Sequence, residues 1–217
     1  EKLDGSHNFS KSYSKFEKDT RAYEKDMAKE NMKSKEPYFH MTITKVKVTD
    51  YIVSFYQPWN DTMGKLRAQS EADQIPLILK ETEMLFRTLL PLRPVHRVLE
   101  IGTAYGYSSI FFAHILPESR ITTVELSDTN YQVAVDNIWE QGLTDRIQVI
   151  HGDGSVVLEE LIQDAGTGNE EPFDLIFIDA AKSHYMEFFE KAEKLCSKDA
   201  LIVCDNILMK AFLVDSS

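Results

Sequence analysis

Five short apolar runs rich in β-branched residues recur in the second half of the chain, and they constrain its fold more than any other feature. They are Arg97–Ile101, Arg120–Glu125, Ile147–Ile150, Phe173–Ile178 and Ala200–Cys204, separated by helix-length segments at 107–116, 128–141, 155–165 and 182–196. Strands that alternate with helices predict βαβ units, and therefore a parallel sheet covered by helices on both faces. Ligands of such sheets bind beyond the carboxyl ends of the strands. The sequence thus predicts an α/β fold with its site at that edge.

Helical signals dominate before the first of these runs. Thr49-Asp50 predicts an N-cap in front of Tyr51, Ile52 and Phe55, and further helical patterns fall at about 62–73 and 79–90. A length of 217 residues fits one domain, which we place at residues 41–217.

Residues 1–40 differ in composition from the rest, being rich in Lys, Glu and Ser and poor in aliphatic residues. One helical stripe runs through them, formed by Phe9, Tyr13, Phe16, Tyr23 and Met27, and it predicts an amphipathic helix at about 11–33. The favoured interpretation is a loosely docked extension, or a segment upstream of a true start at Met41. The alternative is a helix that binds a partner or forms a dimer.

Composition excludes several classes of protein. No apolar run reaches the roughly 18 residues of a membrane helix, and the polar N-terminus has no signal-peptide core, so we expect a cytoplasmic protein without membrane contact. Cys196 and Cys204 lack the spacing of a metal site or a disulfide framework. The formal net charge of −11 argues against a broad surface that coats nucleic acid, although a local basic patch stays open.

The first predicted strand runs into a turn that contains glycine, Gly102-Thr-Ala-Tyr-Gly106, and then into a helix. Small residues let the backbone approach a ligand, and the free amides of the helix start attract negative groups. The G-x-x-x-G spacing differs from the G-x-G-x-x-G of dinucleotide sites. Glu125 ends the next strand, where a carboxylate can accept hydrogen bonds from two ribose hydroxyls, and Asp153 follows the third strand, where an adenine amino group could donate.

Polar residues also follow the fourth and fifth strands. Asp179-Ala-Ala-Lys182 comes after the fourth strand and Asp205-Asn206 after the fifth. Adjacent parallel strands bring such tips together, and two carboxylates with an amide oxygen suit Mg²⁺. Lys182 lies near enough to reach an oxygen bound on that metal.

These segments together resemble a known family. Val98–Ser108, Gly152-Asp153, Phe173–Lys182 and Asp205–Leu208 are similar to the class I S-adenosylmethionine-dependent, metal-dependent O-methyltransferases of the catechol and caffeoyl-CoA type. The resemblance covers about residues 49–210. Within the family, Ile75-Pro-Leu-Ile78 and the Asp-Ala-Ala-Lys motif most resemble the bacterial tRNA 5-hydroxyuridine methyltransferases.

The resemblance implies a Rossmann-like class I methyltransferase fold and a role for each matching residue. The residues implied to bind S-adenosyl-L-methionine are Ile78, Glu100, Gly102, Ser108, Glu125, Gly152, Asp153 and Asp179, with the Ile78 backbone near the methionine end. Asp179, Asp205 and Asn206 are implied ligands of Mg²⁺ or another divalent cation. Asp179 and Lys182 are implied catalytic residues, and Lys182 is the implied general base.

One departure from the family pattern concerns the C-terminus. The family fold ends with two further strands, whereas this sequence stops about a dozen residues after the fifth. We expect either a shortened chain or a sheet edge that another segment or subunit completes, because an uncovered edge favours aggregation. A homodimer or larger assembly is expected from the short sheet, the acidic body of the chain and the helical stripe of Phe9, Tyr13, Phe16, Tyr23 and Met27.

The predicted activity is Mg²⁺-dependent methyl transfer from adenosylmethionine to a hydroxyl oxygen, with 5-hydroxyuridine in tRNA as the expected acceptor. The alternative acceptor is a small catechol or phenylpropanoid, because both kinds of substrate present two vicinal oxygens to the metal. A third interpretation is a binding module of the same fold without catalysis. A nicotinamide oxidoreductase ranks last because of the glycine spacing.

Overall fold

The computed structural model describes residues 46–168 and 171–207. Its helices are α2 (Val46–Val53), α3 (Asp61–Ala72), α4 (Lys80–Leu89), α5 (Tyr107–Ile115), α6 (Asp128–Glu140), α7 (Gly154–Gly166) and α8 (Tyr185–Glu193), with 3₁₀ turns η1 (Leu90–Leu92) and η2 (Lys182–His184). Its strands are β1 (Arg97–Ile101), β2 (Arg120–Glu125), β3 (Ile147–His151), β4 (Phe173–Ile178) and β5 (Cys196–Cys204).

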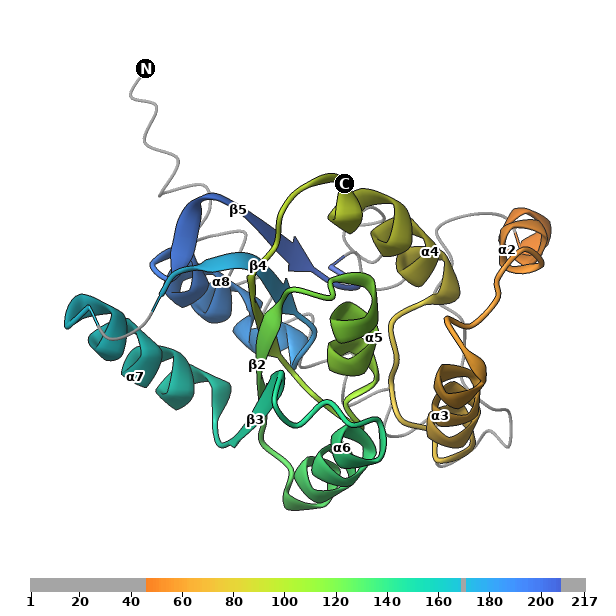
Figure 1. Cartoon of the computed structure of the whole chain (residues 1–217), viewed down its shortest axis with the longest axis horizontal. Helices are drawn as coiled ribbons and strands as arrows, with labels where there is room; N and C mark the ends of the chain where they lie inside the picture. The colour runs from red at the N-terminus through yellow and green to blue at the C-terminus, as the bar shows by residue number, and fades with distance from the viewer. Residues whose placement is uncertain (1–45, 169–170, 208–217) are drawn as a thin grey trace.

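The strands form one parallel sheet in the order β3-β2-β1-β4-β5. Helices α7 and α8 pack on one face of this sheet, and α3, α4 and α5 lie on the other (Figure 1). The predicted α/β, Rossmann-like architecture is therefore confirmed. The chain order reverses between β1 and β4, which is the place where such sheets bind ligands.

Strand β4 is buried on both faces, which explains why residues 173–178 form a continuous apolar run. Leu175 and Phe177 pack into the core under α5, while Ile176 and Ile178 pack into the core under α7 and α8. Successive side chains of a strand point to opposite faces, and both faces here are covered. All four side chains are 0–1% exposed. This central strand thus carries its carboxyl end, and Asp179 after it, to a fixed position.

Two sequence predictions about element ends are wrong. Thr49-Asp50 is not an N-cap, because α2 begins at Val46 and includes both residues. Strand β5 begins at Cys196 and not at Ala200, so the preceding helix ends at Glu193. The polar start of β5 is held against β4 by two hydrogen bonds. The Phe173 amide donates to the Leu195 carbonyl (2.8 Å), and the Ser197 hydroxyl donates to Asp174 (2.9 Å).

Several predictions concern residues that the structure does not describe. The helical stripe of residues 9–27, the boundary at Met41 and the tail at 208–217 all lie outside the described ranges. Within those ranges, no helix is both long enough and apolar enough to cross a membrane.

Candidate functional site

A cavity of about 330 Å³ opens at the carboxyl ends of β1, β2 and β4, on the predicted edge of the sheet. Most of the predicted ligand residues line it: Ile78, Gly102, Ser108, Glu125, Gly152, Asp153 and Asp179. This volume lies in the range of small-molecule and cofactor sites. The structure therefore brings residues from five separate segments of the chain to one pocket.

The turn from β1 into α5 forms one wall of the cavity. Gly102 has a φ of 102°, and a Cβ built on it would lie 2.1 Å from the Asp179 carbonyl oxygen. Only glycine lets this turn pass so close to the end of β4. Gly106, with a φ of 80°, is the N-cap of α5 and offers no side chain to the first amides of that helix, whose residues Tyr107 and Ser108 line the cavity.

Glu125 is fixed on the opposite side of the same turn. Its carboxylate accepts hydrogen bonds from the backbone amides of Ala104 (2.7 Å) and Ser127 (2.8 Å), and the residue is 7% exposed. A carboxylate held by two amides at the end of β2 is well placed to accept further hydrogen bonds from hydroxyl groups of a ligand.

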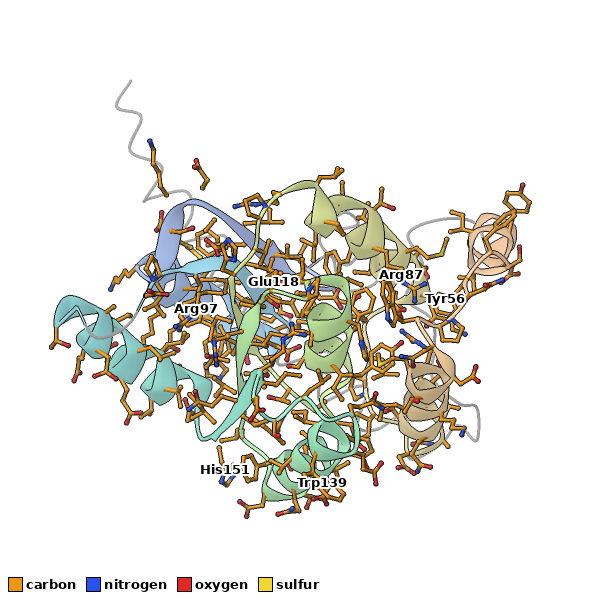
Figure 2. The ribbon with its side chains drawn as sticks, viewed as in Figure 1. Tyr56, Arg87, Arg97, Glu118, Trp139 and His151 are labelled. Carbon is orange, nitrogen blue, oxygen red and sulfur yellow. The ribbon has the colours of Figure 1, made fainter. Side chains whose placement is uncertain are left out.

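His151 ends β3 and Asp153 follows it, and the two residues have different surroundings. Asp153 lines the cavity, but its side chain also caps α7 by accepting from the Ser155 amide (2.8 Å). His151 stacks on Tyr131, with its Nε2 3.0 Å from Asp128, and does not line the cavity. It lies at the outer edge of the molecule (Figure 2).

Glu100 does not line the cavity, contrary to what the family resemblance implied. It is 0% exposed and accepts hydrogen bonds from Ser108, Ser109 and Thr123. The side chain leaves β1 one residue before the strand ends, so it points beneath the cavity wall. Burial raises the pKa of Glu100 to about 7, although the three hydroxyl groups act in the opposite direction.

A second group of polar residues lies where β4 and β5 end. The Asp205 amide donates to the Ile178 carbonyl (2.9 Å), which sets the two strand ends side by side as predicted. Lys182 Nζ lies 3.2 Å from Asp179 Oδ1 and 2.5 Å from the Tyr185 hydroxyl. The Tyr185 hydroxyl in turn donates to the Asp205 carbonyl (3.0 Å). Of this group, Asp179 lines the cavity, whereas Lys182, Asp205 and Asn206 do not.

The donor set at this point fits a divalent cation. Burial and the nearby charge of Asp179 raise the pKa of Asp205 to about 6, although Lys182 acts in the opposite direction. Asn206 donates its side-chain amide to Asp205 (2.9 Å), and its backbone φ is 55°. In the described ranges, no three His, Cys, Asp or Glu side chains form a metal cluster, so a site here needs the Asn206 amide as well.

Sequence reasoning missed several residues that line the cavity. They are Leu77, Thr103, Ala104, Tyr107, Leu126, Asn130, Ala180, Ala181, His184 and Phe188, together with Pro76, Ile101, Val124, Gly154 and Ser155. Most are apolar or small, so nothing in their type distinguishes them from core residues. Their places directly beside Gly102, Glu125 and Asp179 are the signal that could have indicated them.

A buried polar network beyond the cavity was also missed. Arg67 of α3 and Glu83 of α4 form an ion pair at 2.7 Å, with side chains 7% and 0% exposed. Tyr56 and Tyr107 donate to the same Glu83 oxygen, at 2.9 and 2.7 Å. Tyr56 and Arg87 lie beside one another on this side of the molecule (Figure 2), with the guanidinium 5.7 Å from the ring centre. No sequence motif joins these residues, because they come from separate elements.

Comparison with known proteins gives one consistent result. A family model described as O-methyltransferase matches residues 58–217. A catechol O-methyltransferase of Niastella koreensis is 39% identical over 121 residues, which are 55% of this chain and 53% of that protein. A catechol O-methyltransferase of Mycobacterium tuberculosis is 35% identical over 144 residues, covering 65% and 62%. The chain thus spans roughly half to two thirds of the length of these relatives.

Solved structures agree with the sequence matches. An O-methyltransferase from Bacillus cereus in complex with SAH superposes with a TM-score of 0.68 at 28% identity, covering 79% of this chain and 78% of that one.

Proposed function

The chain belongs to the O-methyltransferase family, and from this premise we propose that it transfers a methyl group from S-adenosylmethionine to a hydroxyl oxygen of a small molecule with two vicinal oxygens. One observation carries the proposal. Asp179 lines the cavity and also lies 3.2 Å from Lys182, beside Asp205. The cofactor pocket and the proposed reaction centre therefore share one carboxylate.

The cavity supports adenosylmethionine as the ligand. Glu125 can accept hydrogen bonds from the ribose hydroxyls, since its two amide contacts hold it at the end of β2. The start of α5 suits the carboxylate of the methionine part, because free amides at a helix N-terminus attract negative groups. Asp179 can accept from the amino group of the same part. These contacts would orient the ligand with its reactive end toward β4 and β5.

Asp179, Asp205 and Asn206 are the proposed ligands of Mg²⁺. When bound, adenosylmethionine supplies an activated methyl group and Mg²⁺ supplies a Lewis acid for the acceptor oxygens. Lys182 is the proposed general base, because its side-chain nitrogen is held between Asp179 and Tyr185 and, as the neutral amine, can take the acceptor's hydroxyl proton. Positioning supplies most of the catalysis, up to about 7–11 kcal/mol, and proton transfer adds roughly 10²–10⁴-fold.

We propose a small catechol-type acceptor in preference to tRNA. The matched relatives from Niastella koreensis and Mycobacterium tuberculosis are named catechol O-methyltransferases. The formal net charge of −11 also disfavours a polyanionic substrate. The expectation of 5-hydroxyuridine from the sequence therefore gives way to the alternative acceptor.

The test is a transfer assay with methyl-labelled adenosylmethionine and Mg²⁺. We expect label in catechol but not in resorcinol, because the two hydroxyls of resorcinol are too far apart to share one metal ion. Excess chelator and Asp205→Ala should each remove most of the activity. Label in undermodified tRNA and not in catechol would overturn the proposed acceptor. Binding of S-adenosylhomocysteine without label in any acceptor would instead indicate a binding module.

A further inference from the structure

The buried ion pair between Arg67 and Glu83 is the strongest polar feature that the proposed reaction does not use. Both groups are nearly or fully inaccessible to solvent. Removing two charges from water is costly, and buried pairs often add little to stability compared with apolar side chains of the same size. The pair therefore calls for an explanation other than stability alone.

Arg67 makes contact with one wall of the cavity. Its Nη2 donates to the Ile78 carbonyl (3.1 Å) as well as to Glu83. Ile78 belongs to residues 75–79, which join α3 to α4 without regular structure, and Pro76, Leu77 and Ile78 line the cavity. Residues 75–79 belong to no helix or strand whose hydrogen bonds would fix their backbone. The hydrogen bond from Arg67 to the Ile78 carbonyl therefore helps to hold that backbone in place.

Glu83 makes contact with a second part of the cavity lining through Tyr107. Tyr107 is the first residue of α5 and lines the cavity, and its hydroxyl donates to Glu83 Oε2 (2.7 Å). Arg67 also donates from Nε to the Tyr107 hydroxyl (3.2 Å), and its guanidinium carbon lies 4.5 Å from the centre of that ring. One ion pair thus bonds to two lining segments of the cavity, at the Ile78 carbonyl and at the Tyr107 hydroxyl.

We propose that Arg67 and Glu83 are positioning residues that set the distance between the Ile78 wall and the start of α5, and so shape the end of the pocket that takes the methionine part of the cofactor. This inference rests on the proposed function, which places the ribose at Glu125 and the methionine carboxylate at the start of α5. A ligand without the methionine part should not depend on the ion pair.

The test compares the affinities of two ligands for the full chain by calorimetry. S-adenosylhomocysteine fills both ends of the proposed pocket, and adenosine fills only the end at Glu125. In the double variant Arg67→Met/Glu83→Gln, which removes both charges of the buried pair and leaves the half-buried Arg87 without its Glu83 carboxylate, we expect the S-adenosylhomocysteine dissociation constant to rise roughly tenfold or more. The adenosine constant should change less than about twofold. Arg67→Lys should fall between the wild type and the double variant, because an ammonium group cannot make all the contacts of the guanidinium.

Arg146 provides a matched control. Its guanidinium donates to the backbone carbonyls of Ala113, Leu116 and Ser119, at the end of α5 away from the cavity. Arg146→Met should lower the unfolding temperature and leave the ratio of the two affinities unchanged.

The outcomes separate this inference from the proposed function. Equal losses for both ligands, or no loss in folded variants, would overturn the positioning role while leaving adenosylmethionine binding intact. Tyr107→Phe removes one hydroxyl only, and it should show the same selective loss to a smaller degree if the double variant does not fold. Failure of both variants to fold would assign the network to general folding. A wild-type chain that binds neither ligand would overturn the proposed function itself.

Discussion

Glu100 is a carboxyl group that β1 places wholly inside the protein, where hydroxyl groups of Ser108, Ser109 and Thr123 donate to it. Its pKa rises from an ordinary 4.5 to about 7, mainly because burial disfavours the charged form. Between these two pH values the folded chain binds more protons at this site than the unfolded chain does. The free energy of unfolding must therefore fall as the pH rises through this window.

The prediction concerns Glu100→Gln, which removes the titration. We expect the wild type to lose on the order of 3 kcal/mol of stability through Glu100 between pH 4.5 and 7, and the variant to lack that fall. Urea unfolding at a series of pH values measures it. Glu160→Gln, at an exposed position of α7, serves as the control. If the free energy of unfolding changed with pH in the same way for the wild type and Glu100→Gln, the raised pKa of Glu100 would be contradicted.

Lys182 gives the second prediction at the scale of single residues. Replacement with Met should lower the rate of methyl transfer roughly 10²-fold or more, because the proton acceptor is lost. The dissociation constant of S-adenosylhomocysteine should change little, since the lysine stands behind Asp179 and does not line the cavity. Lys194→Met, at the end of α8, should leave both quantities unchanged. Wild-type turnover in Lys182→Met would refute the general-base role.

Residue types at strand ends predicted the site better than they predicted individual contacts. Glu125 and Asp179 line the cavity because a parallel sheet delivers all its carboxyl ends to one edge. Glu100 is absent from the cavity lining, because a motif gives the order of residues and not the direction of each side chain. The Arg67–Glu83 pair could not be predicted, since only packing of α3 against α4 and α5 brings those charges together.

The turn between β1 and α5 passes close to the end of β4, and this approach requires a glycine at position 102. Gly102→Ala should destabilise the protein by more than about 3 kcal/mol or prevent folding, because the new Cβ would meet the Asp179 carbonyl at 2.1 Å. Gly142 also has a positive φ, of 68°, but has no atom within 4 Å of an added Cβ. Gly142→Ala should therefore cost only about 1–2 kcal/mol of backbone strain. Equal losses of unfolding free energy in the two variants would show that the contact with β4 contributes nothing.

Strand β5 shows the limit of sequence patterns at the scale of elements. Its apolar half, from Ala200, was predicted, whereas its polar half, Cys196–Asp199, was assigned partly to the preceding helix. Polar residues enter the strand because Ser197 pairs with Asp174, which also accepts from the amides of His96 and Arg97. Such long-range partners leave no local period in the sequence.

Several large apolar side chains are exposed on the described part of the molecule. Leu85 and Leu89, one turn apart on α4, are 52% and 45% exposed, and Leu92 follows at 78%. Apolar patches of this kind mark contact surfaces. We expect a dimer or larger assembly by light scattering, weakened by Leu85→Glu/Leu89→Glu but not by Trp139→Glu on α6. A stable monomer for both the full chain and a chain that starts at Met41 would count against any assembly.

The central claim about the whole molecule is that the cavity beyond β1, β2 and β4 binds adenosylmethionine through Glu125. Calorimetry with S-adenosylhomocysteine, on the wild type and on Glu125→Ala, tests it most directly. We predict binding to the wild type and a loss of about 1.5–3 kcal/mol in the variant, the value of charge-assisted hydrogen bonds to the ribose. An analogue without the 2′ and 3′ hydroxyls should lose much less. Absence of binding to the wild type, or equal dissociation constants for wild type and variant, would contradict the claim.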